Sequence, residues 1–106
     1  MTESPRLKQI LDWLSESPDD PELRYALAME YRSLGDDART AESLRSLITD
    51  RPEYVASYLM LAQTLVKLIR DDEAKDVLRA GIAAAKKAGN DHAMSEMAGL
   101  LDSLEG

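Results

Sequence analysis

The sequence predicts an all-α fold built from a repeated pair of helices. Only five glycines and four prolines interrupt the 106 residues, so long helices suit the chain. Apolar residues recur at spacings of three and four, which places them on one side of a helix. The pattern also repeats at an offset of 34 residues, as Pro18 with Pro52 and Leu44 with Leu78 illustrate. A fixed period of this length indicates a stack of antiparallel helix pairs that share one core.

The first expected element is a single helix within residues 4–17. Ser4 is suited to cap it and Pro5 to begin it, because proline at the first helical position forfeits no hydrogen bond. The expected buried face consists of five large apolar side chains, namely Leu7, Ile10, Leu11, Trp13 and Leu14. Counted back from Pro18, this helix is the second half of an incomplete repeat.

A complete repeat of two helices is expected over residues 21–54. Asp20 can cap its first helix, Pro21 can begin it, and Gly35 can end it in the left-handed conformation. Asp36 and Asp37 then begin the second helix. The side chains expected to face inward are Leu23, Leu27, Tyr31 and Leu34 in the first helix, and Ala41, Leu44, Leu47 and Ile48 in the second.

The second complete repeat is expected over residues 55–88, and a terminal helix over residues 91–105. Leu61 and Leu78 should lie in the core of this repeat, whose inward side chains are Tyr58, Leu61, Ala62, Leu65, Leu68, Ala74, Leu78, Gly81 and Ile82. The terminal helix would cap the stack with Ala93, Met94, Met97, Leu100, Leu101 and Leu104. Residues 1–106 thus form one domain of six helices.

This pattern resembles the tetratricopeptide repeat (TPR) family, in the form of a small stand-alone bacterial-type member. The matching residues are Leu27, Ala28, Tyr31, Gly35, Leu44, Leu47 and Pro52 in the first repeat, and Tyr58, Leu61, Ala62, Leu65, Ala74, Leu78 and Ile82 in the second. The chain departs from the family at Arg24, Thr40, Ile69 and Lys86, where an aromatic residue, Ala, Gly and Pro are favoured. Because Lys86 stands where the family favours a proline, the second helix of this repeat is expected to run on to Ala88. The resemblance implies a right-handed stack of antiparallel helix pairs: half-repeat, two full repeats and a terminal capping helix.

The composition argues against several classes of partner. Net charge is −7 and the 13 basic residues are scattered, which disfavours nucleic acid and anionic membrane surfaces. The chain has no cysteine, which excludes disulfides and thiolate metal sites. No signal peptide and no membrane-spanning run is evident, so we expect a cytoplasmic location.

No group of residues suggests catalysis, a metal or another cofactor. His92 is the only histidine, and we expect a partly exposed helix residue rather than an acid–base group. The acidic clusters at 19–20, 36–37 and 71–73 could suggest a divalent metal. Each precedes a predicted helix, however, so we interpret them as helix caps. An enzyme is therefore the weakest of three hypotheses for function.

By resemblance, the first helices of successive repeats line a concave groove that holds protein segments. The residues assigned to this protein-binding groove are Tyr25, Met29, Arg32, Leu59, Gln63, Val66 and, from the terminal helix, Met97. Some relatives hold a peptide's C-terminal carboxylate with Lys and Asn where this chain has Tyr25, Met29, Leu59 and Gln63, so that mode is not expected. The groove is largely apolar instead, and methionine adapts to varied partners.

The leading hypothesis is a non-catalytic protein–protein interaction module that binds a protein or peptide segment in this groove. The alternative is a structural or self-assembling subunit whose groove is buried in a homodimer. A further possibility is that flanking helices cover the groove within the molecule. Replacing Leu59 or Met29 by Glu distinguishes partner binding, homodimer formation and coverage within the molecule. An unpaired charge is costly in an interface or a core, so the variant loses its partner, its dimer or its folded state, respectively.

Overall fold

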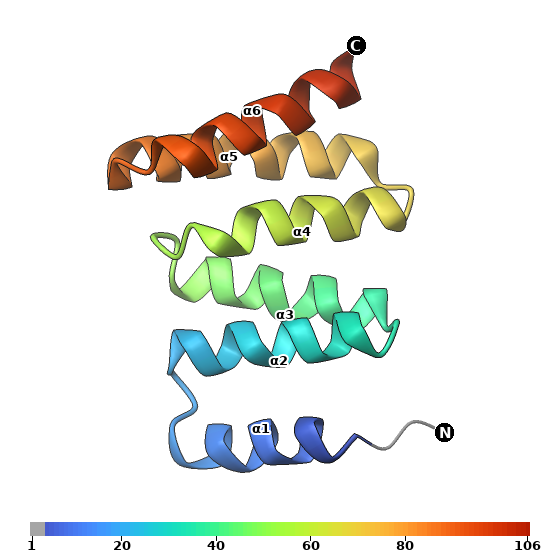
Figure 1. The fold of residues 1–106 in the computed structure, drawn as a ribbon, viewed down its shortest axis with the longest axis vertical. Helices are drawn as coiled ribbons and strands as arrows, with labels where there is room; N and C mark the ends of the chain where they lie inside the picture. Colours follow the sequence, from blue (N-terminus) through green and yellow to red (C-terminus); the bar gives the residue numbers. More distant parts are fainter. Residues whose placement is uncertain (1–3) are drawn as a thin grey trace.

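The computed structural model describes residues 4–106, which form six α-helices joined by short turns (Figure 1). In chain order the helices are α1 Pro5–Glu16, α2 Pro21–Ser33, α3 Asp37–Asp50, α4 Ala56–Lys67, α5 Asp71–Ala88 and α6 Asp91–Glu105. The number and order of helices match the sequence prediction. The predicted extension of α5 to Ala88 is confirmed as well.

Four helices begin at a side chain that accepts a hydrogen bond from the backbone of the first turn. At α2 the Asp20 carboxylate accepts from the Glu22 N–H at 2.9 Å and from the Leu23 N–H at 3.3 Å. These bonds satisfy donors that a helix start otherwise leaves unpaired. The four capping residues are Ser4, Asp20, Asp36 and Asn90.

The capping interpretation was wrong for the third acidic cluster. The residue before α5 is Arg70, and no side chain caps this helix. Residues 71–73 lie one position further on, inside the first helical turn. There the carboxylates still favour the helix, because its N-terminal end carries a partial positive charge.

Three helices are followed by a residue in the left-handed conformation. Gly35 follows α2 with φ of 78°, and Gly89 follows α5 with φ of 69°. The equivalent residue after α4 is Ile69, with φ of 60° and 86% of its surface exposed. A β-branched side chain is strained in this conformation, and that strain explains why the family favours glycine here.

The helices form a single stack in which each helix packs mainly on its neighbours in the chain (Figure 1). Helices α2, α4 and α6 run in one direction, while α1, α3 and α5 run in the other. The last helix, α6, packs on α5 and also touches α4. The first helix, α1, packs on α2.

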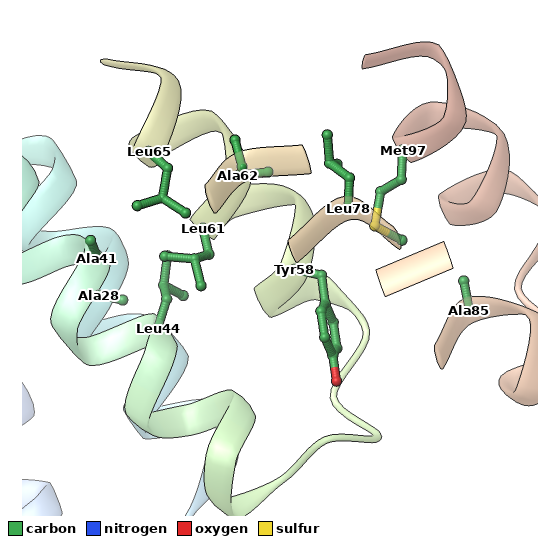
Figure 2. Packing of buried hydrophobic residues seen from close by; sticks show 11 residues of the cluster. Ala28, Ala41, Leu44, Tyr58, Leu61, Ala62, Leu65, Leu78, Ala85 and Met97 are labelled. Atoms are coloured by element: carbon green, nitrogen blue, oxygen red, sulfur yellow. The ribbon is translucent and has the colours of Figure 1, made fainter. Parts of the chain in front are cut away.

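The core lies between α2, α3, α4, α5 and α6 and is mainly aliphatic (Figure 2). Leu61 and Leu78, predicted as core residues, are both fully buried. Small residues such as Ala28 and Ala62 let adjacent helices approach closely. The Tyr58 ring reaches out of this core, where its hydroxyl donates to the Pro52 carbonyl at 2.6 Å.

A close helix contact in the core involves Gly81 on α5. A Cβ atom at this residue would lie 2.6 Å from the Tyr58 Cβ and 2.5 Å from the Met97 sulfur. Both distances are far below a van der Waals contact. Glycine at residue 81 therefore sets how closely α4 and α6 approach α5.

Two departures from the family pattern are accommodated by polar contacts. Arg24 on α2 pairs with Asp50 at 2.9 Å and donates to the Ser46 hydroxyl at 3.0 Å, both on α3. Thr40 is fully buried, and its hydroxyl donates to the Asp36 carbonyl at 2.8 Å. Both side chains thus satisfy their polar groups while taking places that the family gives to aromatic and small residues.

The predicted buried face of α1 was only partly correct. Ile10 is buried and Leu7 and Leu14 are half-buried, but Trp13 is 51% exposed and Leu11 is 45% exposed. The physical reason is that, among the helices described, α1 packs mainly on α2. A single neighbour covers the middle of a wide apolar face and leaves both of its edges in solvent.

Candidate protein-binding groove

Six predicted groove residues form two stripes, one on α2 and one on α4. Tyr25, Met29 and Arg32 follow one another at spacings of four and three, and so do Leu59, Gln63 and Val66. This spacing keeps each set on one face of its helix. Because α2 and α4 run in the same direction, the two stripes are parallel (Figure 1).

The apolar members of both stripes are partly exposed. Tyr25, Met29, Leu59 and Val66 pack with one side against the core cluster, and the rest of each side chain reaches solvent. Arg32 is exposed and makes no ion pair with any of residues 4–106. The stripes therefore present apolar surface next to an available positive charge.

A tyrosine pair joins the two repeats at one end of the stripes. The Tyr25 ring lies 5.7 Å from the ring of Tyr54, which precedes α4, and the planes are tilted by 47°. Burial, with Tyr54 as a further cause, raises the pKa of Tyr25 above its ordinary value, against an opposing effect of Arg32. Tyr25 accordingly presents a neutral ring and hydroxyl at neutral pH.

Met97 does not belong to the groove, which corrects the sequence prediction. It is 1% exposed and packs in the core against Gly81 (Figure 2). Helix α6 begins 70 residues after α2, whereas two repeats of 34 residues would place it two residues earlier. Two residues turn a helix by about 200°. Met97 thus takes the place of Leu27 in α2, on the inward side.

The same displacement decides what α6 presents outward. The residues equivalent to Tyr25, Met29 and Arg32 are Ser95, Gly99 and Asp102, and all three are exposed. A Cβ at Gly99 would meet no atom within 4 Å, as expected for an outward position. The length of α5, which the sequence did predict, was the available signal for this shift. The apolar residues at the groove positions therefore lie on α2 and α4, and α6 has small or polar residues at the equivalent positions.

Sequence reasoning missed a hollow at the α1 side of the stripes. Met29 lines it together with Arg6, Ala26, Glu30 and Ser33. Glu30 is buried; its carboxylate accepts from the Ser4 hydroxyl at 2.7 Å and pairs with Arg6 at 3.4 Å. These contacts fix the start of α1 on α2. A charged residue within an apolar stretch of α2 was the only sequence signal for them.

The structure gives the remaining candidates for chemistry ordinary surroundings. The His92 side chain is 87% exposed and lies 3.3 Å from Glu96, one turn further along α6. Within residues 4–106, no three His, Cys, Asp or Glu side chains lie close enough together to hold a metal ion. None of the helices described is both long enough and apolar enough to span a membrane.

Among the comparisons with known proteins, the one with solved structures identifies helical-repeat relatives. No family model matches the chain, and no curated protein matches it. Among solved structures, the chain is similar to a tetratricopeptide repeat domain protein from Salinibacter ruber, in solution and in the crystal. Identity is 32% in both cases. The solution structure has a TM-score of 0.80, covering 84% of this chain and 90% of the relative. The crystal structure has a TM-score of 0.78, covering 82% and 97%.

A third structure shares the fold at lower identity. It is a protein from Bordetella parapertussis with 21% identity and a TM-score of 0.82, covering 98% of this chain and 90% of that one. The fold is that of a helical-repeat protein, a class of fold used in protein–protein interaction. The extent and identity of the Salinibacter match show that the chain belongs to the tetratricopeptide repeat family.

Proposed function

We propose that this protein is a non-catalytic interaction module that holds a segment of a partner protein against the stripes of α2 and α4. The observation that carries the proposal is the partial exposure of Tyr25, Met29, Leu59 and Val66 in two parallel rows. Contiguous apolar surface on a small protein usually marks an interface. The proposed groove omits Met97, which is buried in the core.

The stripes also indicate what kind of segment fits. Side chains at helical spacing on α2 and α4 leave a shallow apolar surface, which suits the apolar face of an amphipathic segment. Arg32 lies near the C-terminal end of α2 and has no ion pair within residues 4–106, so an acidic group on the partner can pair with it. Gln63 offers both a donor and an acceptor in the middle of the α4 stripe.

Capture from a lysate of the source organism tests this proposal, with mass spectrometry as the readout. The wild type is compared with Leu59→Glu and with Ala80→Glu, which places the same charge on an exposed position of α5. We expect both the wild type and Ala80→Glu to retain a partner that Leu59→Glu loses. Burial of an unpaired carboxylate in the interface is the physical reason. Retention of the same proteins by Leu59→Glu would place the binding surface elsewhere.

Sedimentation of the same variants separates the alternatives. A wild-type dimer that Leu59→Glu dissolves, with helix content intact, would assign the stripes to self-assembly and overturn the proposal. Loss of helix content in Leu59→Glu would show that this side chain is needed inside the fold. Met29→Glu on α2 then repeats the test on the other stripe.

A further inference from the structure

We propose that the exposed face of α1 is a second interface, at which two copies of this chain pair through antiparallel α1 helices. The surface is a hollow between α1 and α2, here called the α1 hollow. Its lining residues are Pro5, Arg6, Gln9, Ile10, Trp13 and Ala26. It lies apart from the stripes proposed to bind other proteins, although Arg6 and Ala26 also line the hollow next to Met29.

The repeat itself shows what normally covers this face. Counted by the 34-residue offset, Trp13 is equivalent to Leu47 on α3 and to Gly81 on α5, and both of these are buried. In each case the helix that precedes it in the chain, α2 or α4, runs antiparallel and packs alongside. The described residues 4–106 provide no such preceding helix for α1, whose Trp13 is 51% exposed. The fold therefore has a place for one antiparallel helix on α1.

The charges on α1 favour a second copy of the same helix in that place. Arg6 lies near its start and Glu16 at its end, and both are exposed. Arg6 also pairs with Glu30 of α2 at 3.4 Å, but 77% of its side chain reaches solvent and is open to a second carboxylate. Consider two antiparallel α1 helices that face each other on the Trp13 side, related by a two-fold axis at the level of residue 11 along the helix. This axis sets Arg6 of each copy opposite Glu16 of the other. Helix dipoles in antiparallel pairs also place a negative end beside each Arg6. The arrangement is thus self-complementary, as a closed dimer requires.

Two local features of α1 agree with this pairing. Glu16 is the last residue of α1, an unfavourable position for a negative charge, and it makes no ion pair within residues 4–106. The same axis places Trp13 of one copy over Gln9 of the other, at the edge of the α1 hollow. Tryptophan is among the residue types enriched at the positions that dominate interface energetics. Pairing would cover Trp13 and neutralise Glu16 together.

The test uses the full chain and its single tryptophan. Sedimentation equilibrium measures the dimer dissociation constant, while the emission of Trp13 is followed over the same concentrations. We expect dimer formation to coincide with a shift of the emission to shorter wavelength, because the indole leaves water. Trp13→Ala should raise the dissociation constant by roughly tenfold or more, as loss of a central aromatic contact does.

Leu11→Ala is the matched control for Trp13→Ala. Leu11 is nearly as exposed as Trp13 but lies about 200° away around α1, on the other edge of the apolar face. We expect this variant to leave the dissociation constant almost unchanged. Equal weakening by both variants would overturn the proposed orientation.

Charge reversal tests the pairing without touching the apolar contact. Glu16→Arg should weaken the dimer, because it sets a positive charge opposite Arg6 of the other copy. Because Glu16 is exposed at a helix end, Glu16→Arg is expected to fold normally. A chain that stays monomeric at millimolar concentration would overturn the proposal. So would a dimer that Leu59→Glu dissolves and Trp13→Ala does not, which would move self-association to the stripes.

Discussion

Replacement of Gly81 by alanine is the sharpest test of how α4, α5 and α6 pack. In an exposed helix this change stabilises a protein, because glycine loses more conformational freedom on folding than alanine does. At Gly81 the added Cβ would lie 2.5 Å from the Met97 sulfur, 2.6 Å from the Tyr58 Cβ and 3.0 Å from the Tyr58 Cγ. The Met97 sulfur ends a flexible side chain and can move. The Tyr58 Cβ is attached to the backbone of α4, so relief requires α4 and α5 to separate.

The expected magnitude follows from two opposing effects. The gain in helix propensity is about 1 kcal/mol. Inserting one extra methyl group into a packed core costs about 1–3 kcal/mol, and the contact with a rigid atom places Gly81→Ala near the upper end. We therefore expect the free energy of unfolding to fall by about 2 kcal/mol, the difference between these values.

Urea unfolding followed by circular dichroism measures this change, and Gly99→Ala provides the matched control. Gly99 also lies inside a helix, but its Cβ would enter open space. We expect Gly99→Ala to raise the free energy of unfolding by about 0.5–1 kcal/mol. The same substitution should thus have opposite signs at the two residues. If Gly81→Ala is as stable as Gly99→Ala, the close approach of α4 to α5 described above is wrong.

Three further predictions concern a helix cap, a strained turn and an ionisable core residue. Asp20→Ala should lower the free energy of unfolding by about 1 kcal/mol in urea titrations, because two backbone donors of α2 lose their acceptor. Ile69→Gly should raise the thermal midpoint, since glycine adopts the positive φ of this turn without strain, and an unchanged or lower midpoint would argue against that strain. Burial, with Glu53 as a lesser cause, raises the pKa of Tyr58, so the folded state favours the neutral phenol. The stability that this contributes is present below the ordinary pKa of about 10 and is lost as pH rises through the higher pKa of the folded state. Urea titrations from neutral to alkaline pH should therefore show a decline in the free energy of unfolding. The decline should be less steep in Tyr58→Phe.

The parts of the fold that depend on local sequence were predictable. Asp20 caps α2 and Gly35 follows it in the left-handed conformation because each role belongs to a residue type at a fixed distance from the helix. Leu61 and Leu78 were identified as core because the 34-residue period repeats their surroundings. The two apolar stripes follow from the same period, since equivalent residues of successive repeats occupy the same helix face.

Two kinds of feature could not be predicted from the repeat: which face of a flanking helix turns inward, and how many helices pack against it. Met97 was assigned to the groove by continuing the period, but the longer α5 displaces α6 by two residues and turns Met97 inward. Trp13 was assigned to the buried face of the first helix by counting the repeat back from Pro18, although among the helices described α1 packs mainly on α2. Arg70 replaces a capping residue because the third acidic cluster is shifted by one position. The errors at Met97 and Trp13 arose from extending the repeat into the flanking helices, whose neighbours differ from those of the complete repeats.

The packing of each helix mainly on its neighbours in the chain has a kinetic consequence. A contact between residues that are near in sequence joins the ends of a short loop. The conformational entropy lost before the first stabilising contacts form is therefore small. Chains of this type refold within microseconds to milliseconds. Opening also starts at the ends, because α1 is held by α2 alone among the helices described. Amide hydrogens of α1 should therefore exchange with solvent long before those of α4, whose opening requires the separation of α3, α5 and α6.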